Sequence, residues 1–171
     1  KAKQGLGYLK NKEFEITSFE QKEGKEGNPR LYDLTSLQVD ANKKFGFSAD
    51  ETLKLIQGLY EKKLTTYPRV DTTYLTEDLH TKIPNILRGM TYYSRFTEVL
   101  LKDPIPKTKI VFNDKKVTDH HAIIPTGVLL SGVSPSEQKI YDLIAKRFIA
   151  VFYPACIVSN TTVLGKVEKL K

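Results

Sequence analysis

Segments with a β-type pattern stand at both ends of this chain, and the residues between them have helical periodicity. Polar and apolar residues alternate in "KEFEITSFEQK" (12–22), as in a half-buried strand, and the glycines and proline of "EGKEGNPR" are expected to break that strand. At the other end, "PACIVSNTTVLGKVE" (154–168) is rich in β-branched residues. Because terminal segments commonly lie near each other at the surface, the pattern predicts a discontinuous β domain that is interrupted by an inserted helical domain. A single α+β domain explains the pattern nearly as well.

Two helices have clear start signals. Ser48 is followed three residues later by Glu51, and Ser134 is followed by Pro135 and Glu137, which is the spacing of a capping box. Apolar residues then recur at intervals of three and four, at Leu53, Ile56, Leu59 and Tyr60 after the first cap and at Ile140, Leu143, Ile144 and Phe148 after the second. Each stripe predicts one buried helix face.

Weaker helical patterns cover about 34–44 and, less regularly, 77–100. Pro84 must start, kink or end a helix in the second of these segments, because proline lacks a backbone N–H. Helices in the middle and strands at the ends together predict the α+β class.

The net charge indicates a class of binding partner, and the cysteine content indicates a cellular compartment. The 27 basic residues exceed the 20 acidic ones, and the formal net charge of +7 suits a polyanion such as nucleic acid. Cys156 is the one cysteine, so an internal disulfide is excluded; its apolar neighbours predict a buried thiol in a reducing compartment, the cytoplasm.

No apolar run approaches the roughly 20 residues of a membrane span. The missing initial methionine and the strand-like C-terminus lead us to expect a piece of a larger protein.

The chemistry is concentrated in "LTTYPRVDTTYL" (64–75). Proline pushes its predecessor into extended conformations, so Tyr67, Arg69 and Asp71 are predicted to project from one face. A phenol with a pKa near 10 attacks phosphorus only where a cation stabilises the phenolate, and the fork of an arginine grips two phosphate oxygens. We therefore consider Tyr67 a candidate nucleophile, Arg69 its phosphate contact and Asp71 a residue that holds the guanidinium. The alternative is a turn with a surface ion pair, the usual fate of so short a motif.

A second candidate constellation is "TDHHAIIPT" (118–126). In an extended segment His120 and His121 lie on opposite faces, so only one of them can face a given site. Zinc needs three or four nitrogen or sulfur ligands, and three histidines and one cysteine in the whole chain make a metal site a weak interpretation. The remaining alternatives are a structural histidine and a phosphate contact or proton carrier beside the tyrosine.

The stretch from Leu34 to Asp71 and the run "DHHAIIPT" resemble the type IA DNA topoisomerases in order and spacing, and within them the topoisomerase III subgroup. The resemblance implies that Tyr67 is the nucleophile that becomes joined to a 5′ phosphate of single-stranded DNA. It also implies that Arg69 contacts the scissile phosphate and that His120 lies near the same site. Asp71 matches a commonly acidic position, and three threonines take DNA-binding or supporting positions: Thr66, Thr72 and Thr126.

The resemblance further implies a β-rich arch domain formed by 1–31 and 128–171, with a mainly helical catalytic-tyrosine domain, 32–127, inserted in it. The Mg²⁺ ligands of such enzymes lie in a separate Toprim domain that contains an Asp-x-Asp-x-Asp run, and this chain contains no Asp-x-Asp. We therefore expect Mg²⁺ in the complete enzyme, with no metal bound by this chain and no cleavage of DNA by this chain alone.

The expected partner is single-stranded DNA, and the complete enzyme is expected to be a monomer that relaxes and decatenates DNA. A helicase is a further candidate partner, and no membrane association is expected. The competing hypothesis is a non-catalytic single-strand-binding module whose exposed rings stack on bases: Tyr67, Tyr74, Tyr92 and Tyr93. Relaxases and tyrosine recombinases fit less well. Relaxases separate their histidines by one residue, and recombinases place the tyrosine after the histidine, whereas Tyr67 precedes His120.

Overall fold

The computed structural model describes residues 13–167. Contacts between Cα atoms divide these residues into two compact units. One unit consists of residues 13–27 and 155–167, and the other consists of residues 28–154. The first and last segments of the described residues thus pair with each other, while the residues between them pack on themselves.

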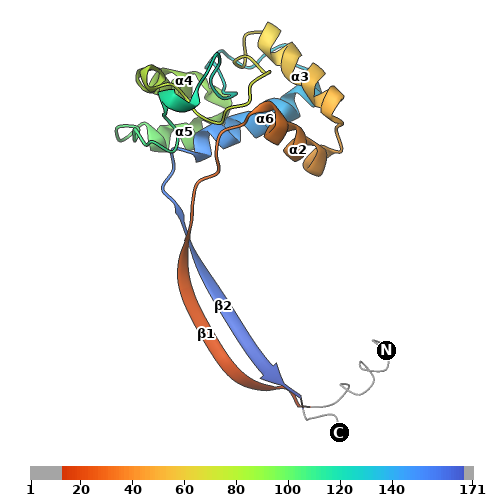
Figure 1. The fold of residues 1–171 in the computed structure, drawn as a ribbon, viewed down its shortest axis with the longest axis vertical. Helices are drawn as coiled ribbons and strands as arrows, with labels where there is room; N and C mark the ends of the chain where they lie inside the picture. Colours follow the sequence, from red (N-terminus) through yellow and green to blue (C-terminus); the bar gives the residue numbers. More distant parts are fainter. Residues whose placement is uncertain (1–12, 168–171) are drawn as a thin grey trace. The chain divides into compact units, whose positions relative to one another are not determined.

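The first unit is a two-stranded antiparallel ribbon of β1 (Glu15–Glu26) and β2 (Cys156–Lys166), shown in Figure 1. Its register runs from Glu15 opposite Lys166 to Glu26 opposite Cys156, with an irregularity between Ile16 and Ser18. Both predicted strands are confirmed. The strand β1 ends at Glu26, within the segment 23–30 that was expected to break it, although the pairing continues through Gly24, which lies opposite Val158.

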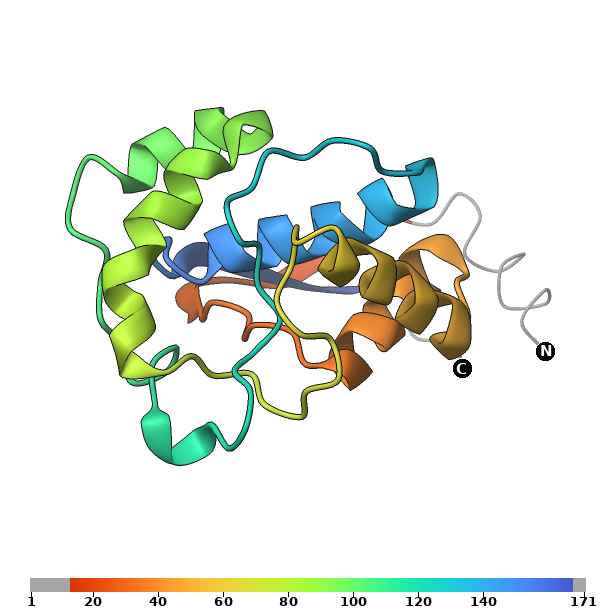
Figure 2. The same cartoon turned by 90° about the horizontal axis from the view of Figure 1, so that it is seen from above.

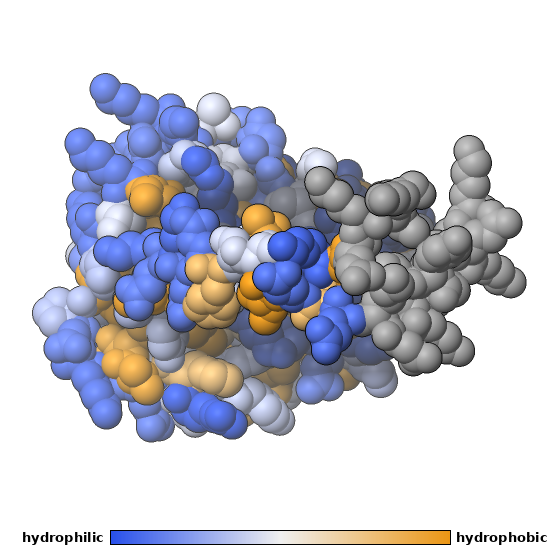
Figure 3. Space-filling model, turned by 90° about the horizontal axis from the view of Figure 1, so that it is seen from below, coloured by the Kyte–Doolittle hydropathy of each residue, from blue (hydrophilic) through white to orange (hydrophobic). Residues whose placement is uncertain are grey.

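The ribbon leaves its apolar side chains exposed. Cys156, expected to be buried, is exposed, because in the described residues neither face of this two-stranded sheet is covered where β2 begins. The large exposed apolar residues of this unit are Phe14, Ile16, Phe19, Ile157, Val163 and Leu164. On the face shown in Figure 3, apolar side chains form small groups among hydrophilic ones.

The second unit is mainly helical. Its α-helices are α2 (Leu34–Phe45), α3 (Ala49–Glu61), α4 (Ile83–Gly89), α5 (Ser94–Leu100) and α6 (Pro135–Ala150), and its 3-10 turns are η1 (Glu77–Lys82), η2 (Thr91–Tyr93) and η3 (Asp114–Lys116). Helix α6 crosses the middle of this unit, with α2 and α3 packed against it at one end and α4 and α5 grouped at the other (Figures 1 and 2). None of the helices in residues 13–167 is both long and apolar enough to cross a membrane.

Helix α6 forms where the capping box predicted it. The Ser134 side chain accepts from the Glu137 backbone N–H, and the Glu137 carboxylate accepts from the Ser134 N–H at 2.7 Å. Glu137 is 8% exposed and also accepts from Lys62 at 2.7 Å, which ties the end of α3 to the start of α6. All four residues of the predicted stripe are buried: Ile140, Leu143, Ile144 and Phe148.

Because this apolar face packs on α3 and α2, residues 128–154 lie in the helical unit, although the expected β-rich part began at 128. The compact helical unit extends from residue 28 to residue 154, and the expected catalytic-tyrosine domain, 32–127, lies within it. Whether these units correspond to an arch and a tyrosine domain stays a prediction.

The 77–100 segment is interrupted twice. Pro84 lies in the first turn of α4, so it starts a helix, one of the three outcomes expected for it. Helix α4 ends at Gly89, where a Cβ atom would overlap the carbonyl group of Gly127. Gly127 itself has a φ of +83° and lies against Ile86. The end of α4 therefore packs backbone to backbone on the loop that follows Thr126.

Gly89→Ala is expected to destabilise the protein by about 2–3 kcal/mol, because backbone atoms must move to admit the methyl group. The measurement is the free energy of unfolding from urea titrations of the wild type and the variant. Gly27→Ala is the matched control, since a methyl group added there would meet no atom within 4 Å and its φ is not left-handed. Equal stabilities of the Gly89→Ala and Gly27→Ala variants would contradict the close contact.

Candidate functional site

The candidate site begins where α3 ends. Lys63 adopts the left-handed conformation, with φ 59°, and the Leu64 N–H donates to the Leu59 carbonyl at 3.0 Å, which closes the helix. Residues 64–66 then run antiparallel to residues 124–126. The Thr66 N–H donates to the Ile124 carbonyl at 3.0 Å. This pairing brings the tyrosine segment beside the two-histidine segment, far away in the sequence.

The residues after Thr66 alternate as predicted. Pro68 and Val70 are buried, whereas Arg69 and Asp71 are exposed and Tyr67 is half-buried. The guanidinium of Arg69 and the carboxylate of Asp71 thus lie on the open side of the segment, while the phenol of Tyr67 is half-buried and does not line the groove described below.

Tyr67 lies between two aromatic rings. Its ring centroid is 4.5 Å from that of His120, with the planes tilted by 41°. On its other side, the ring of Tyr60 from α3 meets it edge-on at 5.5 Å. These contacts hold the Tyr67 ring beside an exposed imidazole and leave the residue partly open to solvent.

The two histidines have different environments, as the alternation predicted. His120 is exposed and faces Tyr67. His121 is half-buried, and its Nδ1 lies 2.8 Å from the Ala122 carbonyl oxygen. Burial lowers the pKa of His121, which favours its neutral form. Only His120 is therefore placed to act beside the phenol.

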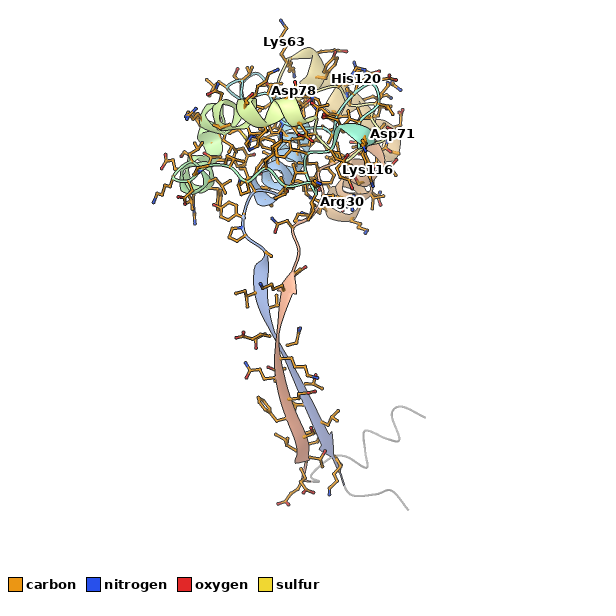
Figure 4. All side chains as sticks on the ribbon, turned by 60° about the vertical axis from the view of Figure 1, so that its left-hand side comes forward. Arg30, Lys63, Asp71, Asp78, Lys116 and His120 are labelled. Carbon is orange, nitrogen blue, oxygen red and sulfur yellow. The ribbon has the colours of Figure 1, made fainter. Side chains whose placement is uncertain are left out.

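An open groove with a volume of about 440 Å³ adjoins this cluster. Its lining residues are Leu34, Thr35, Arg69, Val70, Asp71, Thr118, Asp119 and His120. The start of α2 thus forms one wall, and the tyrosine and histidine segments form the others. Figure 4 shows two of these side chains, Asp71 and His120, on the same side of the helical unit.

Arg69 is not paired with Asp71. The ion pairs between described residues include neither side chain, so the expectation that Asp71 holds the guanidinium is wrong for this structure. Both side chains are exposed and line the groove. The Arg69 fork is consequently available to an anion.

Comparison with known proteins identifies the fold and the family. A family model described as "DNA topoisomerase" matches residues 1–171. The chain belongs to the DNA topoisomerase family. It is 46% identical over 157 residues to DNA topoisomerase 3 of Bacillus cereus, covering 89% of this chain and 22% of that protein. It is 44% identical over 167 residues to DNA topoisomerase 3 of Bacillus subtilis, covering 95% and 23%.

These relatives confirm the resemblance to the topoisomerase III subgroup of type IA enzymes, and the chain spans less than a quarter of their length. Among solved structures, the chain is similar to full-length topoisomerase I from Thermotoga maritima, with a TM-score of 0.62 and 22% identity over 98% of this chain and 28% of that one. This similarity confirms the predicted α+β fold.

Within this topoisomerase fold, the three candidate threonines make internal hydrogen bonds. Thr66 Oγ1 donates to the Ala122 carbonyl at 3.2 Å and accepts from the Ile124 N–H at 3.0 Å. Thr126 Oγ1 donates to the Lys63 carbonyl at 2.6 Å, and Thr72 Oγ1 donates to the Lys116 carbonyl at 2.6 Å. Their geometry supports a role in holding the site together.

The described residues offer no metal centre. No group of three or more histidine, cysteine, aspartate or glutamate side chains within residues 13–167 is placed to hold a metal ion. Asp71, Asp119 and His120 line the groove without forming such a group. A Mg²⁺ ion therefore does not fit this part of the topoisomerase chain by itself.

Sequence reasoning missed two parts of the site. Tyr60 was assigned to the apolar stripe of α3, yet its ring contacts Tyr67. Its position seven residues before Tyr67, at the end of a predicted helix, was the available signal. Thr35 lines the groove from the first turn of α2, and no local motif marks it, because only the tertiary packing of α2 places it there.

Proposed function

We propose that this chain carries the reactive tyrosine of a type IA topoisomerase that cleaves and rejoins single-stranded DNA. The Tyr67 oxygen forms a bond to phosphorus, and the bond from phosphorus to the deoxyribose 3′ oxygen breaks. The phenol loses its proton and the leaving 3′ oxygen gains one. The phosphotyrosine diester keeps the energy of the broken bond, so the 3′ hydroxyl rejoins the strand by the reverse step.

The observation that carries this proposal is the convergence of Tyr67 and His120 beside a groove that Arg69 lines. A guanidinium in the groove stabilises both the phenolate and the charge that develops on the phosphate. His120 contacts the phenol ring and is exposed to the groove, so it is placed to contact a phosphate oxygen or to move a proton. The threonines Thr66 and Thr126 position the two segments, and Asp71 contributes a groove carboxylate.

We place the Mg²⁺ ligands of the complete enzyme outside residues 13–167, because these residues offer no metal-binding group. The ion supplies electrostatic stabilisation at the phosphate when it is bound. Relaxation and decatenation of DNA belong to the complete protein, acting in the cytoplasm.

This chain alone is expected neither to cut nor to relax DNA, since Arg69 and His120 supply only part of the charge stabilisation that strand cleavage needs. The test is incubation with negatively supercoiled plasmid and Mg²⁺, followed by gel electrophoresis. The positive control is the complete protein that contains this chain, assayed at the same concentration. Relaxation by the isolated chain would refute the proposed division of the active site.

The competing function, a single-strand-binding module with four stacking tyrosines, is less well supported. Tyr74 and Tyr93 are only 8% and 9% exposed, so their rings cannot stack on bases without rearrangement. The Tyr93 hydroxyl donates to Asp142 at 3.1 Å, which is a structural role. Of the two remaining rings, Tyr92 is 70% exposed, whereas Tyr67 is half-buried between Tyr60 and His120, so one open ring is left for stacking.

A further inference from the structure

A second group of cations surrounds the ring of Tyr74, and none of its residues lines the groove. The Arg30 guanidinium carbon lies 5.2 Å from the centroid of this ring, and Arg30 Nη1 donates to the Tyr74 hydroxyl. The Lys116 ammonium nitrogen also lies 5.2 Å from the ring centroid. Both cationic side chains belong to exposed residues. Two positive charges thus converge on one phenol.

Within residues 13–167 neither Arg30 nor Lys116 forms an ion pair with a carboxylate. Another arginine of this chain shows the contrast: Arg147 lies 4.1 Å over the ring of Tyr32 and pairs with Asp40 at 2.6 Å. The positive charge of the arginine beside Tyr32 is balanced by the carboxylate of Asp40, whereas the cations around Tyr74 form no ion pair among the described residues.

The cationic group is held in place by the backbone. Thr72 Oγ1 donates to the Lys116 carbonyl and accepts from the Tyr74 N–H at 3.3 Å. Arg147 Nη1 donates to the Arg30 carbonyl at 3.1 Å. The Tyr74 carbonyl in turn accepts from the Ala122 N–H at 2.9 Å, two residues after His120. The cluster is therefore built into the same framework as the candidate site.

The Arg30, Lys116 and Tyr74 side chains have further hydrogen-bond donors that a ligand can use. A guanidinium has five N–H donors, of which Arg30 uses one toward Tyr74, and an ammonium group has three. The hydrogen bond from Arg30 lowers the pKa of the Tyr74 phenol, and the hydroxyl that accepts this bond can still donate its own proton. Arginine, lysine and phenol donors that converge without an ion-pair partner among the described residues suit a phosphate group.

We infer that Arg30, Lys116 and Tyr74 form a second phosphate subsite, which binds the backbone of single-stranded DNA next to the groove. In the view of Figure 4, His120, Asp71, Lys116 and Arg30 follow one another along one side of the helical unit. Lys116 also lies two residues before Thr118, which lines the groove. The subsite extends the proposed function, because it holds a phosphate other than the one that reacts. Its ring, being buried, positions the cations and does not stack on bases.

The test measures binding of a short fluorescein-labelled single-stranded thymidine oligonucleotide to the 171-residue chain by fluorescence anisotropy over a range of KCl concentrations. The variant Arg30→Gln with Lys116→Gln is expected to bind on the order of tenfold more weakly at ~0.1 M salt. The slope of log K against log salt is expected to fall in magnitude by about 1.4, since each phosphate contact on a single strand contributes about 0.7.

The matched control is Arg95→Gln with Lys139→Gln, which removes the same charge from two exposed cations that also lie over aromatic rings, at 5.2 Å from Phe96 and 5.5 Å from Phe45. Its slope is expected to stay within about 0.3 of the wild-type value, because it loses no phosphate contact. Lys116→Gln alone changes only an exposed side chain and keeps the backbone bond to Thr72, so it tests the subsite even where the double variant folds poorly. It is expected to lower the slope by about 0.7.

Equal losses in the two double variants would overturn the subsite, because they would show a general charge effect. Salt-independent binding by the wild-type chain would overturn it as well. Neither result would affect the Tyr67 chemistry, which is measured separately as a covalent adduct of the complete protein.

Discussion

In the complete protein, Tyr67→Phe is expected to abolish the covalent protein–DNA adduct while the affinity for single-stranded DNA changes by less than about threefold. The substitution removes one oxygen atom and keeps the ring that contacts His120 and Tyr60. Loss of a nucleophile costs a factor on the order of 10⁴ or more in rate. The measurement combines denaturant-trapped adducts on a labelled oligonucleotide with binding by fluorescence anisotropy.

The sharpest control is Tyr60→Phe, because Tyr60 supplies the phenol ring nearest to Tyr67 among the aromatic pairs of the described residues. Tyr60 is 38% exposed, so it is also accessible. Tyr60→Phe is expected to leave the adduct yield within a few fold of the wild type. An adduct that survives Tyr67→Phe and disappears with Tyr60→Phe would move the reaction to the helix residue and defeat the assignment of Tyr67.

The geometry around Tyr67 was predictable because it depends on short-range rules. Proline restricts the residue before it, and alternation in an extended segment then separates Pro68 and Val70 from Arg69 and Asp71. The same rule placed His120 and His121 on opposite faces, and the resemblance to the family pointed to His120 as the one at the site. The helix starts at Ser48 and Ser134 were equally local, since a capping side chain bonds to a backbone only three residues away.

Features that depend on tertiary packing could not be predicted from the sequence. The apolar stripe of α6 was visible in the sequence, but the helices that it packs against were not, because α3 and α6 meet only in the folded chain. Cys156 has apolar neighbours along the chain, yet exposure depends on whether a second layer covers the sheet. The groove wall at Thr35 and the cation pair around Tyr74 likewise arise from segments that meet only in the folded chain.

Arg69→Ala in the complete protein is expected to slow strand cleavage by a factor on the order of 10²–10³, or about 2.7–4 kcal/mol of transition-state stabilisation. The guanidinium is exposed, lines the groove and has no ion-pair partner in the described residues, so its removal leaves no buried charge unpaired. The free energy of unfolding is therefore expected to stay within ~0.5 kcal/mol of the wild type. Single-turnover cleavage of a labelled oligonucleotide measures the rate, and urea titration measures the stability.

Arg69→Lys separates charge from geometry at this position. Lysine keeps the positive charge but cannot grip two phosphate oxygens with a planar fork, so its cleavage rate is expected to lie between those of the wild type and Arg69→Ala. Arg95→Ala is the matched control, because Arg95 is an exposed arginine of α5 that does not line the groove. A less than tenfold change in cleavage by Arg69→Ala, or an equal change by Arg95→Ala, would mean that the exposed guanidinium beside Tyr67 does not contact the reacting phosphate.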